Sequence, residues 1–323
     1  MPEGHSVHRI ARQFALHFVG RRVAASSPQG RFAAGAAQLD GHVMTEAMAV
    51  GKQMFLEFDN GLWLRVHLGI YGAWDFSGDI TADATIASSN GRIGQTNQRG
   101  TVVGEHEDSL SSIGAPRRTR LRMAEQERLE TPADTFPPEP IGAVRVRLLT
   151  DATCADLRGP TACDVLTPDE VQAVIAKLGP DPLVDTGRAA EDRFTATVLK
   201  KPTPICLLLM DQSVVSGIGN VYRAEILFRA RLNPHIPGRD LPEATVRALW
   251  KDWVKLLKIG VKNGQMMTMD GLSKSAYDGA MASRADRHWV YHRTGLPCRV
   301  CGTSILMEEI GGRKLYWCPV CQA

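Results

Sequence analysis

The spacing of apolar residues along the chain predicts a β-rich first part that begins with a helix. Apolar positions recur at helical intervals over residues 7–18, and two short runs, residues 53–58 and 62–67, have the composition and length of strands. Asp59-Asn60-Gly61 separates these runs, and an Asn-Gly pair favours a tight hairpin turn. We therefore expect the two strands to pair with each other.

The strand pattern then gives way to a stretch with little periodicity. Residues 77–140 are rich in Gly, Ser, Thr, Pro and charged residues, which predicts a mobile insertion with room for a short helix. A strand is expected again over residues 143–149. A helix start follows at Thr167, because this capping residue precedes Pro168 and has Glu170 three positions further on.

A stretch rich in Gly and Pro at residues 178–186 predicts a linker into a helical second part. Helices are expected over residues 203–210 and 221–232, with an irregular, glycine-containing turn between them. In this helix-two-turns-helix arrangement, Asn220 stands at the start of the second helix, where backbone N–H groups favour a DNA phosphate. The spacing is equally compatible with a tight turn in which Asn220 only caps the helix.

The end of the chain carries two Cys-x-x-Cys pairs separated by sixteen residues. This spacing is typical of a zinc ribbon, and a zinc held by four thiolates has no open position for catalysis, so we expect one structural zinc. Strand-like runs at residues 304–310 and 314–317, joined by Gly311-Gly312, predict a hairpin with Arg313 at its tip. The four ligands would be Cys298, Cys301, Cys318 and Cys321.

The N-terminal sequence offers a different chemistry. Removal of Met1 would expose the secondary amine of Pro2. An α-amino group titrates near ~8, so part of it is neutral at physiological pH and can attack a sugar aldehyde carbon to form an iminium. The carboxylate of Glu3 is placed to carry protons. Proline also follows methionine in many unrelated proteins, so these two residues alone do not identify a catalytic pair.

Composition and charge narrow the class of protein. The 323 residues are 44% hydrophobic, which suffices for two domains and a small module. The sequence has no apolar run of membrane-spanning length and no secretory signal pattern, so we expect an intracellular protein. Cys154, Cys163 and Cys206 are expected to be reduced core residues.

The net charge is only +3, but basic residues are concentrated in one part of the chain. Residues 200–262 hold eleven Lys and Arg against five Asp and Glu. Such a local excess predicts a surface that follows DNA phosphates. Lys251, Lys255 and Lys258 also have the spacing of an ordinary solvated helix face, and this second interpretation stays open.

Taken in order along the chain, these segments resemble the Fpg/Nei family of DNA glycosylases. The resemblance covers nearly the whole chain apart from residues 77–140. It rests on Pro2-Glu3-Gly4, residues 215–222 and the terminal ribbon, and on four shorter matches: His67-Leu68-Gly69, Leu157-Arg158-Gly159-Pro160, residues 178–183, and Val290-Tyr291-His292-Arg293.

The resemblance implies an α+β fold with three parts and a connecting linker. We assign residues 1–178 to an N-terminal, β-sandwich-like catalytic domain that contains the insertion at 77–140. Residues 179–190 form the linker, residues 191–290 the helix-two-turns-helix domain, and residues 291–323 the zinc ribbon.

The resemblance also implies a mechanism. Pro2 would attack C1′ of a damaged nucleotide that has been flipped out of the duplex, and the base would leave as a Schiff base forms. Glu3 would open the sugar ring and move protons through β- and δ-elimination. Lys52 matches the family's strand-borne lysine, which would hold a phosphate near the lesion. Without the resemblance, a lysine at this position would be interpreted as a solvated residue on a hairpin. Asn220 and Arg313 would clamp the phosphates that flank the lesion.

Two further regions bear on DNA contact. Ile70 and Tyr71 fall where the family inserts side chains into the gap left by the flipped nucleotide, and ordinary strand core is the alternative. Met266 and Met267 stand where relatives carry a Gly-Thr-Thr pattern, so the sequence departs from the family in a region of phosphate or lesion contacts.

Substrate choice is predicted from short sequence motifs that differ between the branches of the family. Four motifs look like the oxidised-pyrimidine branch: Gly4, residues 209–212, residues 222–225 and His292-Arg293. Ser6 stands where the purine branch has a glutamate. The resemblance thus favours an endonuclease VIII-like enzyme that removes oxidised pyrimidines and cleaves abasic sites. The alternatives are an 8-oxoguanine/formamidopyrimidine glycosylase and a damaged-DNA-binding relative without activity.

These interpretations also predict the protein's surroundings. The expected partner is double-stranded DNA that contains damaged bases or abasic sites, bound by a monomer without membrane association. The expected location is the cytoplasm, at the nucleoid if the source is bacterial. Zinc is the one cofactor, and no organic cofactor is implied.

Overall fold

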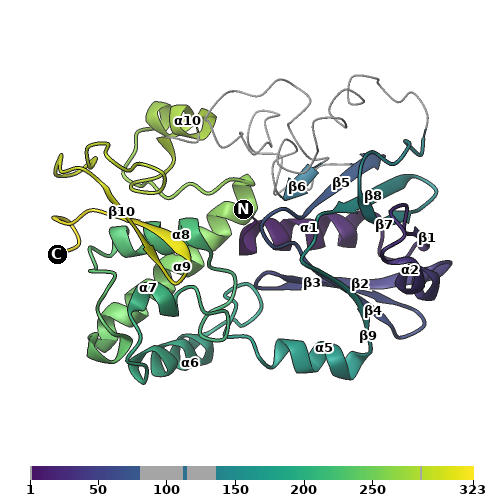
Figure 1. Ribbon diagram of the computed structural model, residues 1–323, viewed down its shortest axis with the longest axis horizontal. Coiled ribbons are helices and arrows are strands. Elements are labelled where there is room, and N and C mark those ends of the chain that lie inside the picture. Colours follow the sequence, from purple (N-terminus) through teal and green to yellow (C-terminus); the bar gives the residue numbers. More distant parts are fainter. Residues whose placement is uncertain (1, 81–111, 115–135, 284–285) are drawn as a thin grey trace. The chain divides into compact units, whose positions relative to one another are not determined.

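The computed structural model of the chain describes residues 2–80, 112–114, 136–283 and 286–323 (Figure 1). The described chain divides into two compact units. The first holds the described residues up to Ala176 together with Val261–Gly264, and the second holds Lys177–Gly260 and Gln265–Ala323. Each unit is considered by itself below.

The first unit is built on one antiparallel sheet of nine strands. Its order is β6-β5-β8-β7-β1-β2-β3-β4-β9. In chain order the strands are β1 (Arg22–Ser26), β2 (His42–Val50), β3 (Gln53–Phe58), β4 (Trp63–His67), β5 (Ala73–Gly78), β6 (Ser112–Gly114), β7 (Val144–Leu149), β8 (Thr153–Arg158) and β9 (Ala162–Leu166). The helices are α1 (Gly4–His17), α2 (Ala33–Leu39) and α5 (Pro168–Ile175).

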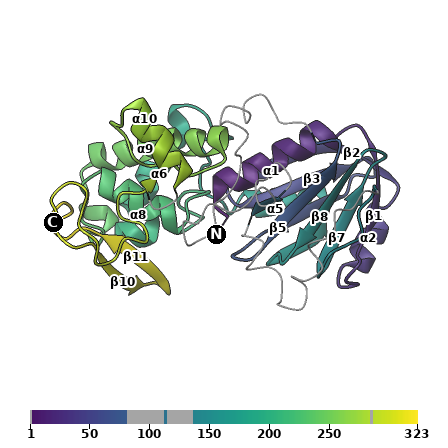
Figure 2. The same cartoon turned by 90° about the horizontal axis from the view of Figure 1, so that it is seen from above.

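Strand β1 joins the two halves of this sheet. Its first residues pair with β2 and its last three, Ala24–Ser26, pair with β7. Apolar residues from both halves of the sheet pack in the same core as the buried face of α1. In this core the rings of Phe14 and Trp74 pack edge to face, with their centroids 4.8 Å apart. Figure 2 shows α1 beside the strands. The sheet therefore closes around one core, as expected of a β-sandwich-like domain.

Most of the local predictions for this unit are confirmed. The paired strands and their Asp59-Asn60-Gly61 turn form β3 and β4, and residues 144–149 form β7. Thr167 and Glu170 make a complete capping box at the start of α5. The first helix begins at Gly4 rather than residue 7, because several polar residues of its first turns are buried and hide the apolar pattern.

The expected insertion at 77–140 needs correction at its start and in its middle. Ser77 and Gly78 belong to β5, and Ser112–Gly114 form β6, which pairs with β5. Residues 81–111, between β5 and β6, and residues 115–135, after β6, lie outside the described residues, and so does the short helix expected in this stretch.

The second unit is helical and ends in a hairpin. Its elements are α6 (Arg188–Leu199), α7 (Ile205–Leu208), α8 (Asn220–Arg229), the 3₁₀ helix η3 (Gly238–Asp240), α9 (Glu243–Asn263) up to Gly260, α10 (Lys274–Ala282), β10 (Leu306–Ile310) and β11 (Arg313–Trp317). The helix expected over 203–210 is only the short α7, since the Asp211 side chain accepts hydrogen bonds from Ser213 and forms a turn. The helix expected over 221–232 is α8.

Three cysteines lie away from the chain terminus, and none is in a disulfide. Cys154 and Cys206 are buried, and Cys163 packs at the edge of the first unit's core. Burial raises the pKa of Cys154 and of Cys206 to about 11 and that of Cys163 to about 12. These thiols are therefore unreactive packing residues, as expected. Of the helices that the structure describes, none is long and apolar enough to cross a membrane.

Candidate active site and zinc ribbon

Pro2 and Glu3 directly precede α1, and both are buried. Glu3 has an extended backbone at the N-cap position, and its carbonyl oxygen accepts hydrogen bonds from the amides of Ser6 at 3.0 Å and Val7 at 3.4 Å. Its side chain makes no cap hydrogen bond to the helix. The backbone of Glu3 is thus fixed by the helix, while its carboxylate is not used to begin it.

Helix α1 carries a buried polar stripe that sequence reasoning missed. His5, Arg9 and Gln13 recur at four-residue spacing and are at most 4% exposed. Burial, and then the charge of Arg12, lower the pKa of Arg9 to about 10. The Arg9 guanidinium lies against Gly264, where a Cβ atom would collide with it. The four-residue recurrence of polar side chains after the Pro2-Glu3 pair was the available signal.

Lys52 lies at the tip of the β2–β3 hairpin. Val50 pairs with Gln53, so Gly51 and Lys52 form a two-residue turn, in which Gly51 has φ of 60°. The pKa of His67 is lowered by burial first and then by the positive charges of Lys52 and Arg65. The Lys52 ammonium therefore lies close to the end of β4.

Ile70 and Tyr71 occupy the turn that follows β4, and they are 42% and 59% exposed. The alternative of strand core is therefore wrong for both. The turn is held by glycines: Gly69 has φ of 64° and faces Thr161, and the amide of Gly72 donates to the Leu68 carbonyl at 2.9 Å. This arrangement presents two apolar side chains on a constrained loop.

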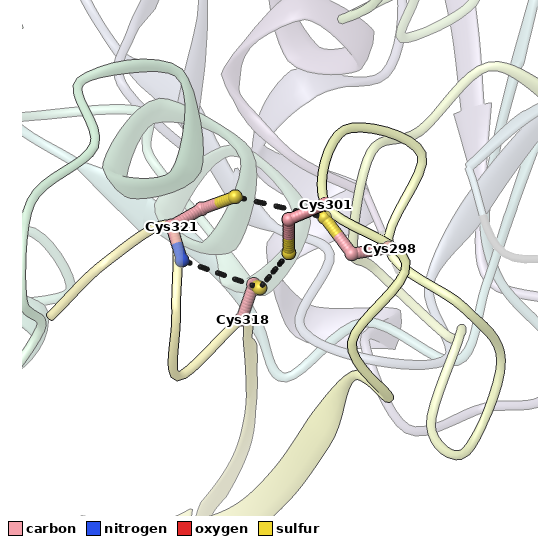
Figure 3. A group of neighbouring side chains, drawn as sticks. All are labelled: Cys298, Cys301, Cys318 and Cys321. Atoms are coloured by element: carbon pink, nitrogen blue, oxygen red, sulfur yellow. Dashed lines mark hydrogen bonds between the residues drawn. The ribbon is translucent and has the colours of Figure 1, made fainter.

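The four ribbon cysteines converge in the structure (Figure 3). Their sulfur atoms all lie within 4.8 Å of one another, with 3.8 Å between Cys298 and Cys321 and 3.5 Å between Cys301 and Cys318. Tetrahedral zinc with Zn–S bonds of about 2.3 Å places its sulfur ligands roughly 3.8 Å apart. The cluster therefore fits one zinc ion, and four protein ligands make it a structural site.

Between the cysteine pairs, β10 and β11 form the expected hairpin. Ile310 pairs with Arg313 across Gly311 and Gly312, which have φ of 58° and 68°. Arg313 is exposed as the first residue of β11, which confirms its place at the tip. Further along β11, Leu315 is fully buried and holds the strand against the rest of the unit.

Asn220 opens α8, but its side chain does not cap the helix. Its Nδ2 donates to the Lys314 carbonyl at 2.8 Å, and its Oδ1 accepts from Arg223 at 2.5 Å. The interpretation of Asn220 as a simple helix cap is therefore wrong. Since Lys314 follows Arg313 in the chain, the structure brings together two of the predicted DNA-contact residues, Asn220 and Arg313.

Glu225, also on α8, is a second anchor that the sequence did not reveal. Its carboxylate is fully buried and accepts four hydrogen bonds, from the Thr268 hydroxyl at 2.5 Å and from the amides of residues 289, 290 and 291 at 2.7–2.9 Å. Burial raises the pKa of Glu225, and this effect exceeds the lowering of the pKa by the four hydrogen bonds. The carboxylate thereby fixes the segment that leads into the ribbon.

Met266 and Met267 act as packing residues. Met267 is 2% exposed, and Met266 packs against the cluster formed by residues of α8, β11 and the ribbon. Thioether side chains fill irregular core space well. The departure from the family pattern therefore places apolar side chains inside the unit.

Three arginines of the basic stretch at 200–262 make their contacts within the protein. Arg229 makes a two-point contact with Asp252 at 2.7 and 2.8 Å, and Arg223 is completely buried. Arg247 pairs with three carboxylates. Lys251, Lys255 and Lys258 are exposed on α9, which agrees with both interpretations of these lysines, a solvated helix face and a phosphate-following surface.

Comparison with protein families gives three matches in the same order along the chain. The formamidopyrimidine-DNA glycosylase N-terminal domain matches residues 1–129, and the formamidopyrimidine-DNA glycosylase H2TH domain matches residues 178–270. A zinc finger found in FPG and IleRS matches residues 295–323.

Two curated relatives illustrate the range of similarity. The chain is 37% identical to Endonuclease 8 1 of Mycobacterium tuberculosis over 322 residues, which covers 100% of both chains. It is 36% identical to the formamidopyrimidine-DNA glycosylase of Thermus thermophilus over 149 residues, which covers 46% of this chain and 55% of that one.

Solved structures share the fold at lower identity. The Lactococcus lactis Fpg in complex with DNA containing an abasic site has a TM-score of 0.66 at 19% identity, with 99% of each chain covered. The MutM (Fpg) protein of Thermus thermophilus has a TM-score of 0.62 at 22% identity, with 99% of this chain and 98% of that one covered.

Proposed function

The chain belongs to the Fpg/Nei family of DNA glycosylases and abasic-site lyases, and from this premise we propose that it removes oxidised pyrimidines from double-stranded DNA. In the same proposal it cleaves the resulting abasic site by β,δ-elimination and acts as a monomer. The main support is full-length similarity to an endonuclease 8 combined with Pro2 and Glu3 buried at the start of α1.

The chemistry starts at the N-terminal amine. The lone pair of the Pro2 nitrogen attacks C1′, the bond from C1′ to the base breaks, and the base leaves with the bonding electrons. Glu3 protonates the ring oxygen as the sugar opens, which gives an iminium between Pro2 and C1′. Loss of a C2′ proton then expels the 3′ phosphate, loss of a C4′ proton expels the 5′ phosphate, and water hydrolyses the iminium to release the sugar remnant from Pro2. Burial of both residues favours this chemistry by limiting access of water.

The DNA contacts are distributed between the two units. Lys52, half-buried at the turn between β2 and β3, supplies a point charge for a phosphate near the lesion. Ile70 and Tyr71 enter the gap that the flipped nucleotide leaves, for which their exposure on a constrained turn is suitable. Asn220 and Arg313 clamp the flanking phosphates, and their closeness in the second unit supports this assignment.

Borohydride trapping on a duplex with an abasic site tests the mechanism, because only an imine-forming enzyme becomes covalently attached to the DNA. The wild-type protein is expected to be trapped. Retaining Met1 should abolish trapping, and Pro2→Gly should weaken it, since a primary amine replaces the secondary one. Glu3→Gln should bind DNA normally but lose base excision. Normal strand cleavage by a protein with a blocked N-terminus would refute the assignment of Pro2.

The choice of lesion is tested with matched duplexes at one salt concentration. Thymine glycol and dihydrouracil should be excised faster than 8-oxoguanine opposite cytosine. Preference for 8-oxoguanine over both pyrimidines would replace the proposed specificity by that of a formamidopyrimidine glycosylase. Tight binding of all three duplexes without excision or trapping would instead indicate a DNA-binding protein that lacks activity.

A further inference from the structure

Arg223 makes hydrogen bonds to both sides of the predicted phosphate clamp. Its Nη2 donates to Asn220 Oδ1 at 2.5 Å and to the Lys314 carbonyl at 3.0 Å. Asn220 Nδ2 donates to the same carbonyl at 2.8 Å. These three bonds close a ring between the start of α8 and β11, one residue away from Arg313.

We infer that Arg223 is a positioning residue for DNA binding, which sets the orientation of the Asn220 amide and holds the strand that carries Arg313. This inference rests on the proposed function, in which Asn220 and Arg313 bind the flanking phosphates. Arg223 itself is 0% exposed, so it acts through these two groups and not by touching DNA.

The amide of Asn220 needs such a guide because its two ends have nearly the same size. Rotation by half a turn would exchange the oxygen with the NH₂ group. In the observed orientation, the oxygen faces a guanidinium donor and the nitrogen faces a carbonyl acceptor. The rotated amide would set donor against donor at Arg223 and acceptor against acceptor at Lys314. The observed orientation also fixes the direction of the second N–H of Asn220, the kind of donor that a phosphate accepts.

Arg223 also contributes a permanent charge. A guanidinium stays protonated inside proteins, and its field is screened less in a buried position than in water. The charge therefore favours a phosphate near Asn220 and Arg313 without contacting it. The sequence had suggested a basic residue on the surface, whereas the structure places this cation behind the groups that face DNA.

The test measures equilibrium binding to a duplex that contains a tetrahydrofuran abasic analogue, which the protein cannot cleave through an imine. Arg223→Gln and Asn220→Ala should each weaken binding about tenfold, as expected for loss of a charged hydrogen-bonding group. Because Arg223 acts partly through Asn220, the double variant should lose less affinity than the sum of the two single losses. Zinc content is measured for every protein to confirm that the ribbon is intact.

Arg229→Gln provides the matched control, since Arg229 is on the same helix but pairs with Asp252. Its effect, which arises from folding alone, should add fully to that of Asn220→Ala. The inference would be overturned if the losses of affinity from Arg223→Gln and Asn220→Ala added fully in the double variant. It would also be overturned if Arg223→Gln left the affinity for the abasic-analogue duplex unchanged. If Arg223→Gln loses zinc, Arg223→Lys, which keeps the charge, replaces it in the same comparison of single and double variants. A wild-type protein that does not distinguish the abasic analogue from undamaged DNA would reject the proposed function itself.

Discussion

Two hairpins of similar local design present a cation at their tips, one in each unit. Gly51 and Lys52 join β2 to β3, and Gly311 and Gly312 join β10 to β11, directly before Arg313. Each turn has two residues and uses glycine at positive φ. The turn chemistry is thus nearly the same, although the surrounding structure is not.

The difference lies in what holds each hairpin. β3 is an inner strand of the nine-stranded sheet, and its Met54 and Leu56 enter the apolar core. β10 and β11 form a sheet of only two strands, which is marginal in isolation and relies on the zinc cluster and on contacts with α8. One tip is therefore held by buried apolar area and the other by metal and polar bonds, so different perturbations should affect them.

Loss of the metal should have the largest effect, and it should unfold one hairpin while leaving the other unchanged. Cys318→Ser removes one of the four thiolates, and structural zinc contributes about 10–16 kcal/mol to folding in isolated zinc-finger peptides. We expect zinc to be released and amide exchange in β10 and β11 to approach that of an unfolded chain. Exchange in β2 and β3 should not change. Protection that persists in β10 and β11 without zinc would contradict the comparison.

An apolar truncation should have the opposite distribution. Leu56→Ala removes a fully buried side chain of β3 and should lower the free energy of unfolding of the first unit by about 2–5 kcal/mol, with zinc retained. Leu306→Ala in β10 is the matched control, since Leu306 is 43% exposed and should change stability by less than about 0.5 kcal/mol. Chemical denaturation with a zinc assay distinguishes these outcomes.

The anchor at Glu225 should have an intermediate effect. Glu225→Gln replaces an acceptor-only carboxylate with an amide, so an NH₂ group faces backbone N–H donors of residues 289–291. A cost of about 2 kcal/mol is expected, seen as faster amide exchange in that segment. Glu309→Gln, on the exposed side of β10, should leave exchange unaltered. Equal effects of the two variants would show that the buried carboxylate has no special role.

Changes at the two tips should affect DNA affinity and leave the fold intact. Lys52→Ala and Arg313→Ala each remove one proposed phosphate contact, so each should reduce the salt dependence of DNA binding by about one unit of slope. Zinc content should stay at the wild-type value, as should thermal stability at a pH above the titration range of His67. An unchanged slope for either variant would identify that residue as an ordinary surface cation.

The smallest effect concerns His67, whose pKa is lowered by burial and then by Lys52 and Arg65. Lys52→Ala should raise the pKa of His67 by less than burial lowers it, as measured by an NMR titration of the ring. Since the folded-state pKa lies below the unfolded value of about 6.5, the native state resists protonation, and stability falls as pH drops through this window. The variant should reduce that loss, whereas Lys255→Ala should not.

Features set by neighbouring residues in the chain were predictable from the sequence. The Asp59-Asn60-Gly61 turn, the capping box at Thr167 and the cysteine spacing each encode their structure within a few positions. The roles of Pro2 and Glu3 came from family resemblance, because a proline and a glutamate at a chain start have no distinctive spacing. Those roles stay predictions, as do the domain boundaries.

Features that depend on distant contacts were not predictable. β1 pairs with β7, and directly after β1 the Ser27 hydroxyl donates to the Arg145 carbonyl, 118 positions away along the chain. From the sequence alone, Arg223 is predicted to be a cation on the surface of a helix. In the structure it donates a hydrogen bond to the Lys314 carbonyl of β11, 91 positions further along the chain. Periodicity within one segment cannot show which remote strand will cover it. Both of the anchors on α8 were therefore missed.

The order of strands in the large sheet also determines how freely the chain between them can change in length. β5 ends at Gly78 and β7 begins at Val144, and both pair with β8, so the sheet fixes the two ends of this connection, while β6 within it pairs with β5. The entropy cost of closing such a connection grows only with the logarithm of its length, and doubling it costs about 0.6 kcal/mol. Long insertions at this point are therefore thermodynamically inexpensive, which makes it a suitable place for evolution, or for protein engineering, to add new sequence.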